Sequence, residues 1–178
     1  MAAAVTSLWP VTVSMGDVAR GPVRRDLTAD EAVRKGIAKG LDLQSVDRLA
    51  ATVSVSSWLD GAEVKGRWNA ALTQLCVITL EPLPIELSGE FVIRLVPPGS
   101  DAAPGVEEEI DLDPEADDPP DIMESDIIDV GHYVVEQLTL EIDPFPRKPG
   151  VEFVQPQSSE PESPFAVLRK LQEPGKDG

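Results

Sequence analysis

Alternating apolar and polar positions predict several β-strands in the first half of the chain. A loose alternation covers residues 8–18, and a regular one covers residues 49–58. A Leu-Asp-Gly turn signal follows the second run, and residues 64–72 are expected to return as its hairpin partner. Residues 85–96 alternate again, and Gly89 within them is expected to make a bulge or bend. The pattern therefore predicts an antiparallel meander.

Helical spacing occurs in two places. Thr28 and Glu31 match the capping box of a helix start, and Gly40 is suited to end that helix. A second helix is favoured over residues 127–142, where Asp129 supplies the cap, although the last residues fit a strand equally well. The apolar positions of the first helix recur at every fourth residue: Ala29, Val33, Ile37 and Leu41.

These elements predict an α+β fold class. We expect an antiparallel β-meander or a partly open, barrel-like sheet with two to three helices packed on it. Residues 1–150 are expected to form a single domain that carries a disordered acidic insert at about 97–121. Residues 151–178 are expected to form a polar linker and a short C-terminal helix, because Ser163-Pro164 supplies a cap followed by proline.

The charge is distributed very unevenly. The 178 residues include 15 Lys and Arg and 32 Asp and Glu, which gives a formal net charge of −17. No basic residue occurs between Arg94 and Arg147, whereas 16 acidic residues do, so the remainder holds 16 acids and 15 bases. We therefore expect a nearly neutral body with one anionic, proline-rich insert that is either functional or simply solubilising. This distribution excludes a uniformly basic nucleic-acid-binding protein.

The chain has few residues suited to catalysis or metal binding. Cys76 and His132 are the only cysteine and histidine, which excludes an internal disulfide, a multi-cysteine cluster and a two-histidine metal site. They are a candidate nucleophile and base, but a single cysteine after an apolar strand is more typical of core packing. Phosphate-binding glycine loops and the EF-hand pattern do not occur in the sequence. We predict no catalytic residue, metal or cofactor.

The sequence favours a cytoplasmic location without a membrane span. Residues 1–16 lack the basic region of a signal peptide and contain Trp9-Pro10. The longest apolar uncharged run, residues 68–80, is shorter than the roughly 20 residues that a bilayer span requires.

Three small sets of basic residues are candidates for contact with RNA or another partner. One precedes the first helix, one lies on it, and one lies in the proline-rich segment after residue 143. Each set alone is more typical of a solvated surface, but together they would form a phosphate-binding patch if the fold brings them together. The candidate residues are Arg24, Arg25, Arg34, Lys35, Lys39, Arg147 and Lys148.

Four sequence blocks resemble the YceD family. They are CVITLEP at residues 76–82, DIIDVG leading into VEQL at 126–138, PFPRKPG at 144–150 and PFAVL at 164–168. Their order and spacing are most similar to the alphaproteobacterial branch of that family. The residues that carry the motifs are Cys76, Leu80, Glu81, Pro82, Glu136, Gln137, Leu138, Pro146, Pro149 and Gly150.

The resemblance implies a cytoplasmic, non-catalytic factor of ribosome biogenesis. It would support the synthesis or accumulation of large-subunit ribosomal RNA by binding that RNA or an early assembly intermediate. The alternative is an acidic, chaperone-like protein that binds a basic ribosomal protein.

The resemblance also raises the question of zinc. Many members of the family carry a C-x-x-C pair at the first block and a second pair near the proline-rich block, which implies zinc in them. Here Thr79 takes the second position of the first cysteine pair, and Arg147-Lys148 lie near where the second cysteine pair would fall. One thiolate cannot replace four ligands, so we expect packing around Cys76 and Leu80 to hold this region instead.

Overall fold

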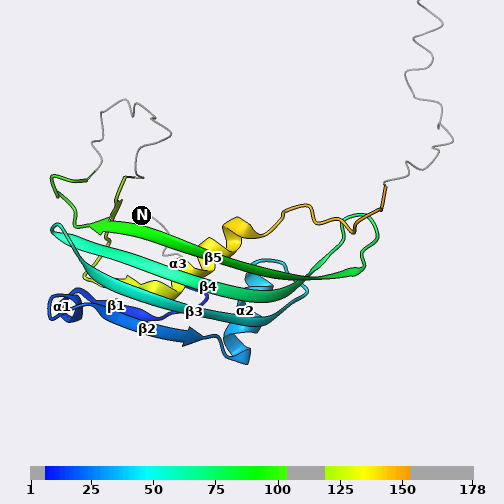
Figure 1. Ribbon diagram of the computed structural model, residues 1–178, viewed down its shortest axis with the longest axis horizontal. Coiled ribbons are helices and arrows are strands. Elements are labelled where there is room, and N and C mark those ends of the chain that lie inside the picture. Colours follow the sequence, from blue (N-terminus) through cyan, green and yellow to red (C-terminus); the bar gives the residue numbers. More distant parts are fainter. Residues whose placement is uncertain (1–6, 104–118, 153–178) are drawn as a thin grey trace, which may run out of the picture.

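The computed structural model describes residues 7–103 and 119–152. Within these described ranges, ten elements follow one another in sequence order (Figure 1). They are β1 (Thr12–Ser14), α1 (Met15–Val18), β2 (Val23–Thr28), α2 (Glu31–Gly40), β3 (Ser45–Trp58), β4 (Gly61–Leu75), β5 (Pro82–Val96), β6 (Asp121–Ile122), β7 (Ile127–Asp129) and α3 (Val130–Glu141).

The main sheet has five strands in the order β2-β3-β4-β5-β6 and is not closed. Strands β2 to β5 are antiparallel, and the short β6 runs parallel to β5. β1 and β7 form a separate antiparallel pair. The expected α+β fold with an open, mainly antiparallel sheet is confirmed, and the predicted hairpin of β3 and β4 is longer than its apolar pattern indicated.

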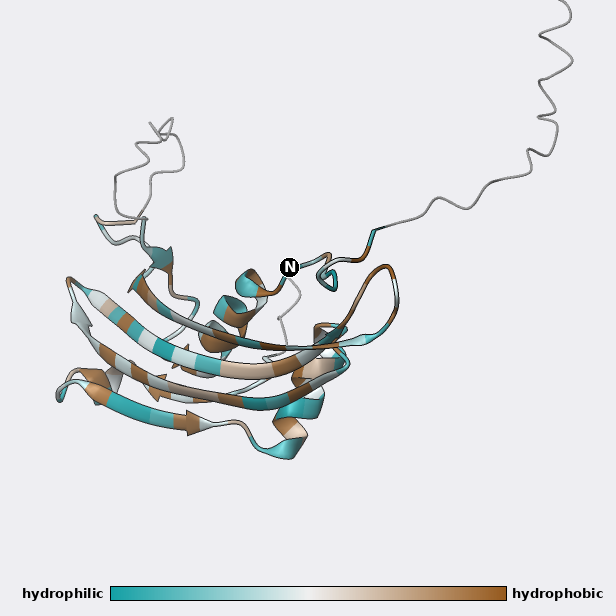
Figure 2. Cartoon of the chain, turned by 45° about the vertical axis from the view of Figure 1, so that its right-hand side comes forward, coloured by the Kyte–Doolittle hydropathy of each residue, from teal (hydrophilic) through white to brown (hydrophobic). Residues whose placement is uncertain are grey.

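One face of the sheet carries the hydrophobic core. Along β4, Val64, Trp68 and Leu72 are buried, while Lys65 and Arg67 between them are exposed. Strands β3 and β5 alternate in the same way, which produces the striped colouring of the strands in Figure 2. The three helices pack on the buried face, where α3 contributes three fully buried side chains: Val130, Val134 and Leu138.

Gly89 does not form the expected bulge. The pairing of β4 with β5 runs without interruption past Gly89, which lies directly opposite Trp68. A side-chain carbon on Gly89 would come within 3.0 Å of the Trp68 indole, and one on Gly66 would meet the ring of Phe91. Each aromatic ring therefore lies over a glycine on the neighbouring strand, so the glycine makes room for packing rather than bending the strand.

The first two elements also differ from the expectation. Only Thr12–Ser14 of the predicted strand over residues 8–18 is extended, because Ser14 caps a short helix by accepting from the Asp17 amide. The capping box at Thr28 is wrong as well. Thr28 pairs with Ala50 as the last residue of β2, and Asp30 caps α2 by accepting from the Val33 amide at 2.8 Å.

The second predicted helix is confirmed as α3, with Asp129 as its N-cap. Asp129 Oδ1 accepts from the amides of Gly131 and His132, and also from the amide of Val11, which precedes β1. The ambiguous end of this segment is helical as far as Glu141.

Parts of the predicted organisation lie outside the described residues. These are most of the acidic insert, namely residues 104–118, and the C-terminal segment from residue 153, which includes the PFAVL block. Within the described ranges, no helix is long and apolar enough to cross a membrane.

Candidate functional site

The connection between β4 and β5 is a tight turn built around Cys76. The Cys76 amide donates to the Glu81 carbonyl at 2.9 Å, and the Leu80 amide donates to the Cys76 carbonyl at 2.8 Å. Leu80 has a φ of 58°, which is left-handed and uncommon for a branched residue. Three of the motif residues, Cys76, Leu80 and Glu81, are therefore joined through the backbone of the turn.

The segment after α3 contacts this turn through hydrogen bonds and an ion pair. The Val77 amide donates to the Pro146 carbonyl at 3.0 Å, and the Lys148 amide approaches Cys76 Sγ at 3.4 Å. The Lys148 ammonium donates to Glu81 Oε2 at 2.7 Å. We call residues 76–81 together with residues 146–150 the Cys76 corner, because these contacts join two segments about seventy positions apart.

Two further contacts shape the Cys76 corner. Pro149 and Gly150 occupy the centre of a turn closed by the Val151 amide and the Lys148 carbonyl, and the φ of 78° at Gly150 is that of a type II turn. Gln74, buried at the end of β4, donates to the Asp143 carbonyl at 2.8 Å. A polar residue at an inward-facing strand position was the sequence signal for this contact, which we did not predict.

The hydrogen bonds at the Cys76 corner favour the charged form of the thiol. The Thr79 hydroxyl is the main cause, followed by the backbone amides of Lys148, Thr79 and Ile78, and together they lower the pKa of Cys76 to about 6. Burial of the thiol acts in the opposite direction and is outweighed. The ion pair with Lys148 lowers the pKa of Glu81, and the same pair raises the pKa of Lys148.

The residues of the Cys76 corner do not fit zinc. Thr79 offers the thiol a hydroxyl donor, and Lys148 brings an ammonium where a thiolate ligand would be needed. No group of three or more His, Cys, Asp or Glu side chains suited to a metal ion occurs in the described ranges. The expected packing around Leu80 is wrong, because its side chain is 71% exposed. Hydrogen bonds and one ion pair hold the corner instead.

Cys76 and His132 lie in different surroundings. His132 is in the first turn of α3. Cys76 instead contacts Lys148, which follows the C-terminal end of that helix. Twelve helical residues span about 18 Å. His132 instead contacts the ring of Tyr133, beside a hollow between β7 and α3.

The first basic set lies at the start of the edge strand β2. Arg24 and Arg25 line a hollow of about 360 Å³ together with Arg20. The Arg24 guanidinium pairs with Asp26, while Arg25 projects from the opposite face of the strand and donates to the Arg24 carbonyl. Both arginine side chains are exposed.

The second basic set lines a larger hollow beside α2, which we call the α2 groove. Arg34, Lys35 and Lys39 surround about 580 Å³ together with residues 43–47. Arg34 donates to the Asp47 carbonyl, and Lys35 pairs with Glu31 at 2.6 Å. Lys39 forms no ion pair within the described residues.

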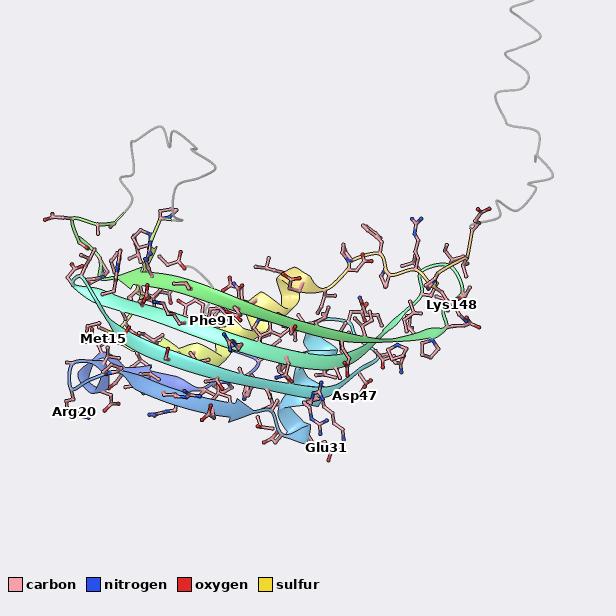
Figure 3. The ribbon with its side chains drawn as sticks, viewed as in Figure 1. Met15, Arg20, Glu31, Asp47, Phe91 and Lys148 are labelled. Atoms are coloured by element: carbon pink, nitrogen blue, oxygen red, sulfur yellow. The ribbon has the colours of Figure 1, made fainter. Side chains whose placement is uncertain are left out.

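The structure does not bring the three basic sets together. Lys148 lies at the same end of the sheet as Glu31 and Asp47 but across its width, and Arg20 lies at the other end (Figure 3). Strands β3 and β4 separate β2 from β5, which is about 14 Å at the usual spacing of strands. The first two sets lie along the β2 and α2 side, whereas Arg147 and Lys148 belong to the Cys76 corner.

A comparison with protein families identifies the chain. The model described as large ribosomal RNA subunit accumulation protein YceD matches residues 64–172. The chain belongs to the YceD family. No curated protein and no solved structure matches it. The match begins at Val64 within β4 and includes β5, α3 and the whole Cys76 corner, but it excludes β2 and α2.

Other motif residues of this YceD-family chain lie on α3. Leu138 is fully buried in the core, Gln137 is half-buried, and Glu136 is exposed beside the hollow between β7 and α3. Pro82 begins β5, directly after the Cys76 turn.

The sequence reasoning missed a further group of bases, of which it had named only Arg24 as a candidate. The face of the sheet opposite the core, which we call the outer face, carries five of the 15 Lys and Arg residues. The sequence signal was the alternation within β4, whose charged positions share one face. The five bases are Arg24, Arg48, Lys65, Arg67 and Arg94, and four acids lie among them: Asp26, Glu63, Glu86 and Glu90.

Proposed function

We propose that this chain is a non-catalytic cytoplasmic factor that supports accumulation of large-subunit ribosomal RNA by binding that RNA or an early assembly intermediate. Membership of the YceD family supports the process, because the family is described by large ribosomal RNA subunit accumulation. The binding step and the absence of catalysis belong to the proposal.

The α2 groove is the observation that carries the contact with RNA. Three basic side chains from one helix surround a hollow of about 580 Å³, and residues 43–47 form its opposite wall. Arg34 is held in place by one nitrogen that donates to the Asp47 carbonyl, and its Nε is buried, so its second terminal nitrogen is the one that can reach a phosphate. Lys39, with no acidic partner in the described residues, offers a second cation.

Contacts of this kind are electrostatic and depend on salt. Each phosphate that a basic side chain neutralises releases counterions, so affinity falls as salt rises. The chain has a formal net charge of −17, so general attraction to RNA is excluded and binding requires local basic surfaces.

The experiment measures binding of the full chain to transcribed large-subunit ribosomal RNA at several salt concentrations. The double variant Arg34→Gln/Lys39→Gln should bind several-fold more weakly, and its salt slope should flatten by about 0.7–0.9 for each lost phosphate contact. The comparison variant Glu31→Gln/Lys35→Gln removes an ion pair from the same groove without changing its net charge, so it should weaken binding less than Arg34→Gln/Lys39→Gln does. The recovered RNA should be uncleaved. A wild-type chain that does not bind the RNA would overturn the proposal.

A second function, binding of a basic ribosomal protein, is favoured by the hollow that His132 and Tyr133 line. A cavity of about 690 Å³ lies between β6, β7 and α3, and no Lys or Arg of the described residues lines it. Its carboxylates include Asp121, Glu124 and Glu136, beside the aromatic ring of Tyr133. Burial, and after it the nearby carboxylates, raise the pKa of Tyr133 to about 12.

A pull-down from a nuclease-treated lysate separates the two functions. Ribosomal proteins retained without RNA, and lost from the variant Glu124→Gln/Glu136→Gln, would support the chaperone-like function. Retention that depends on intact RNA would instead support RNA binding.

A further inference from the structure

The outer face of the sheet is an uncovered surface that no helix or strand of the described residues overlies. Its rows run across four strands, as in the row formed by Arg24, Ser54, Lys65 and Val92. The floor between the charges consists of small residues, mostly polar: Ala50, Thr52, Ser54, Ser56, Asn69, Ala71 and Ser88. On strands β2 to β5, Val92 is the only large aliphatic side chain of this face that is more than half exposed.

That composition differs from the centre of a protein–protein interface. Such centres are apolar and depleted in charged residues. The outer face instead offers hydroxyl and amide groups at the level of the sheet and guanidinium groups above it. Hydrogen-bonding groups on a flat sheet, with cations spaced over it, suit the sugars, base edges and phosphates of an extended nucleic-acid strand.

The acids on the outer face do not neutralise it strongly. Three arginines of this face pair with a carboxylate. Arg24 pairs with Asp26 on the same strand, Arg67 with Glu90 on the neighbouring strand, and Arg48 of β3 reaches across β4 to Glu86 of β5. Both side chains in each pair are more than half exposed, so the pairs are screened by water and salt. A phosphate can replace such a partner at little cost, because the guanidinium stays solvated throughout.

One end of the outer face carries a more ordered group. The Arg94 guanidinium lies over the ring of Trp58, 5.3 Å from its centre, at the end of the β3–β4 hairpin. Glu63, whose side chain is only 15% exposed, contacts both Arg94 and Lys65. The group holds an aromatic ring and a guanidinium plane at the rim of the face, and both are surfaces on which bases stack.

We propose that the outer face of the sheet docks a single-stranded segment of RNA, with phosphates along Arg24, Lys65 and Arg67 and a base stacked at Trp58 and Arg94. This inference rests on the proposed function and adds to it a second contact surface and the form of RNA that this surface binds. Lys65, Arg67 and Arg94 lie within the span matched by the YceD model, whereas the α2 groove does not.

The test uses the full chain and a fluorescent oligouridine of about 12 nucleotides, a length suited to one stacking surface. Arg67→Gln should weaken binding several-fold, whereas Glu90→Gln should tighten it, because the released guanidinium gains access to a phosphate. A mutation that merely damages the fold would not tighten binding. The matched pair on α2, Lys35→Gln and Glu31→Gln, makes the same two charge changes at the α2 groove, and each should change oligouridine affinity less than its counterpart on the outer face.

Tryptophan fluorescence provides a second readout of the same contact. Trp9 and Trp68 are buried, so quenching by bound oligouridine should come from Trp58 and disappear in Trp58→Phe. Trp58→Ala should weaken binding about fivefold or more, as expected for loss of one stacked base.

The outcomes separate this inference from the proposed function. If oligouridine affinity responds to the α2 pair but not to Arg67 and Glu90, the outer-face inference is overturned and the proposed function stands. The outer-face inference is equally overturned if the outer-face variants bind RNA normally but lose a protein partner in a pull-down. If the wild type binds neither oligouridine nor large-subunit RNA, both fail.

Discussion

Lys148 and Glu81 lie 67 positions apart in the chain and form an ion pair of 2.7 Å. The pair joins the segment after α3 to the turn between β4 and β5. It is half-exposed, so it contributes little alone, but it acts beside two backbone contacts, from Val77 to Pro146 and from Lys148 to Cys76. Several individually weak contacts therefore hold the two segments of the Cys76 corner together.

Breaking the ion pair should loosen the proline-rich segment without unfolding the sheet. In the variant Lys148→Met, we expect faster amide hydrogen exchange at Val77 and Val151, whose amides donate to carbonyls of the 146–150 segment. Exchange in the centres of β3 and β4 should stay at the wild-type rate.

Glu81→Gln is the matched control for the charge of the pair. It keeps an oxygen that accepts from Lys148, so it should produce a smaller increase in exchange than Lys148→Met. Equal exchange in all three proteins would show that the ion pair does not hold the segment.

The contribution of Cys76 to stability should depend on pH. The thiol has a pKa of about 6 in the folded chain and an ordinary value of 9.0. Because the folded-state pKa is the lower one, the thiolate contributes fully above about pH 9, progressively less as the pH falls, and nothing below about pH 6. The difference in unfolding free energy between wild type and Cys76→Ser should therefore grow from pH 6 to pH 9.

Urea titrations across that pH range measure the difference. Thr79→Val removes the main donor to the thiolate and should raise the pKa of Cys76, which ultraviolet absorbance of the thiolate reports. A constant difference between wild type and Cys76→Ser at all pH values would contradict the assignment.

Much of the sheet was predictable because each long strand has one buried face. The alternation in β3, β4 and β5 reflects that burial directly, so the hairpin could be located before the structure was known. β2 was missed because, as an edge strand, it carries Arg24, Arg25 and Asp26 in succession. Charged residues are typical of exposed edges, and they remove the apolar pattern on which the prediction depends.

Individual residues of the candidate site were predictable from the sequence, but the contacts between them were not. The motif residues Cys76, Glu81 and Pro146 were found from the family resemblance, but their mutual contacts join segments that only the fold brings together. The outer face was missed for a related reason. Its bases come from four strands, and strand register, not sequence spacing, places them on one surface.

Gly89→Ala should destabilise the chain although a small residue replaces another small one. The added methyl group would lie 3.0 Å from the buried Trp68 indole, which has little room to move, so we expect a loss of about 1–3 kcal/mol. Gly36→Ala is the matched control: nothing lies within 4 Å of the added carbon, and alanine in a helix should stabilise the chain by about 0.5–1 kcal/mol. Denaturant unfolding of both variants measures the contrast. Equal effects in the same direction would contradict the packing of Trp68 over Gly89.

Asp129→Ala should cost more than loss of an ordinary helix cap. One carboxylate oxygen accepts from the amides of Gly131 and His132 at the start of α3, and from the Val11 amide 118 positions earlier. Truncation removes the cap and leaves the part-buried Val11 amide without this partner, so we expect a loss of about 2–3 kcal/mol in denaturant unfolding. Asp129→Asn keeps one side-chain oxygen and should recover part of that loss. The comparison cap Asp30 accepts from Val33 alone and is exposed, so Asp30→Ala should cost only about 1 kcal/mol. Equal losses for the two alanine variants would mean that Asp129 does not tie the N-terminal segment to α3.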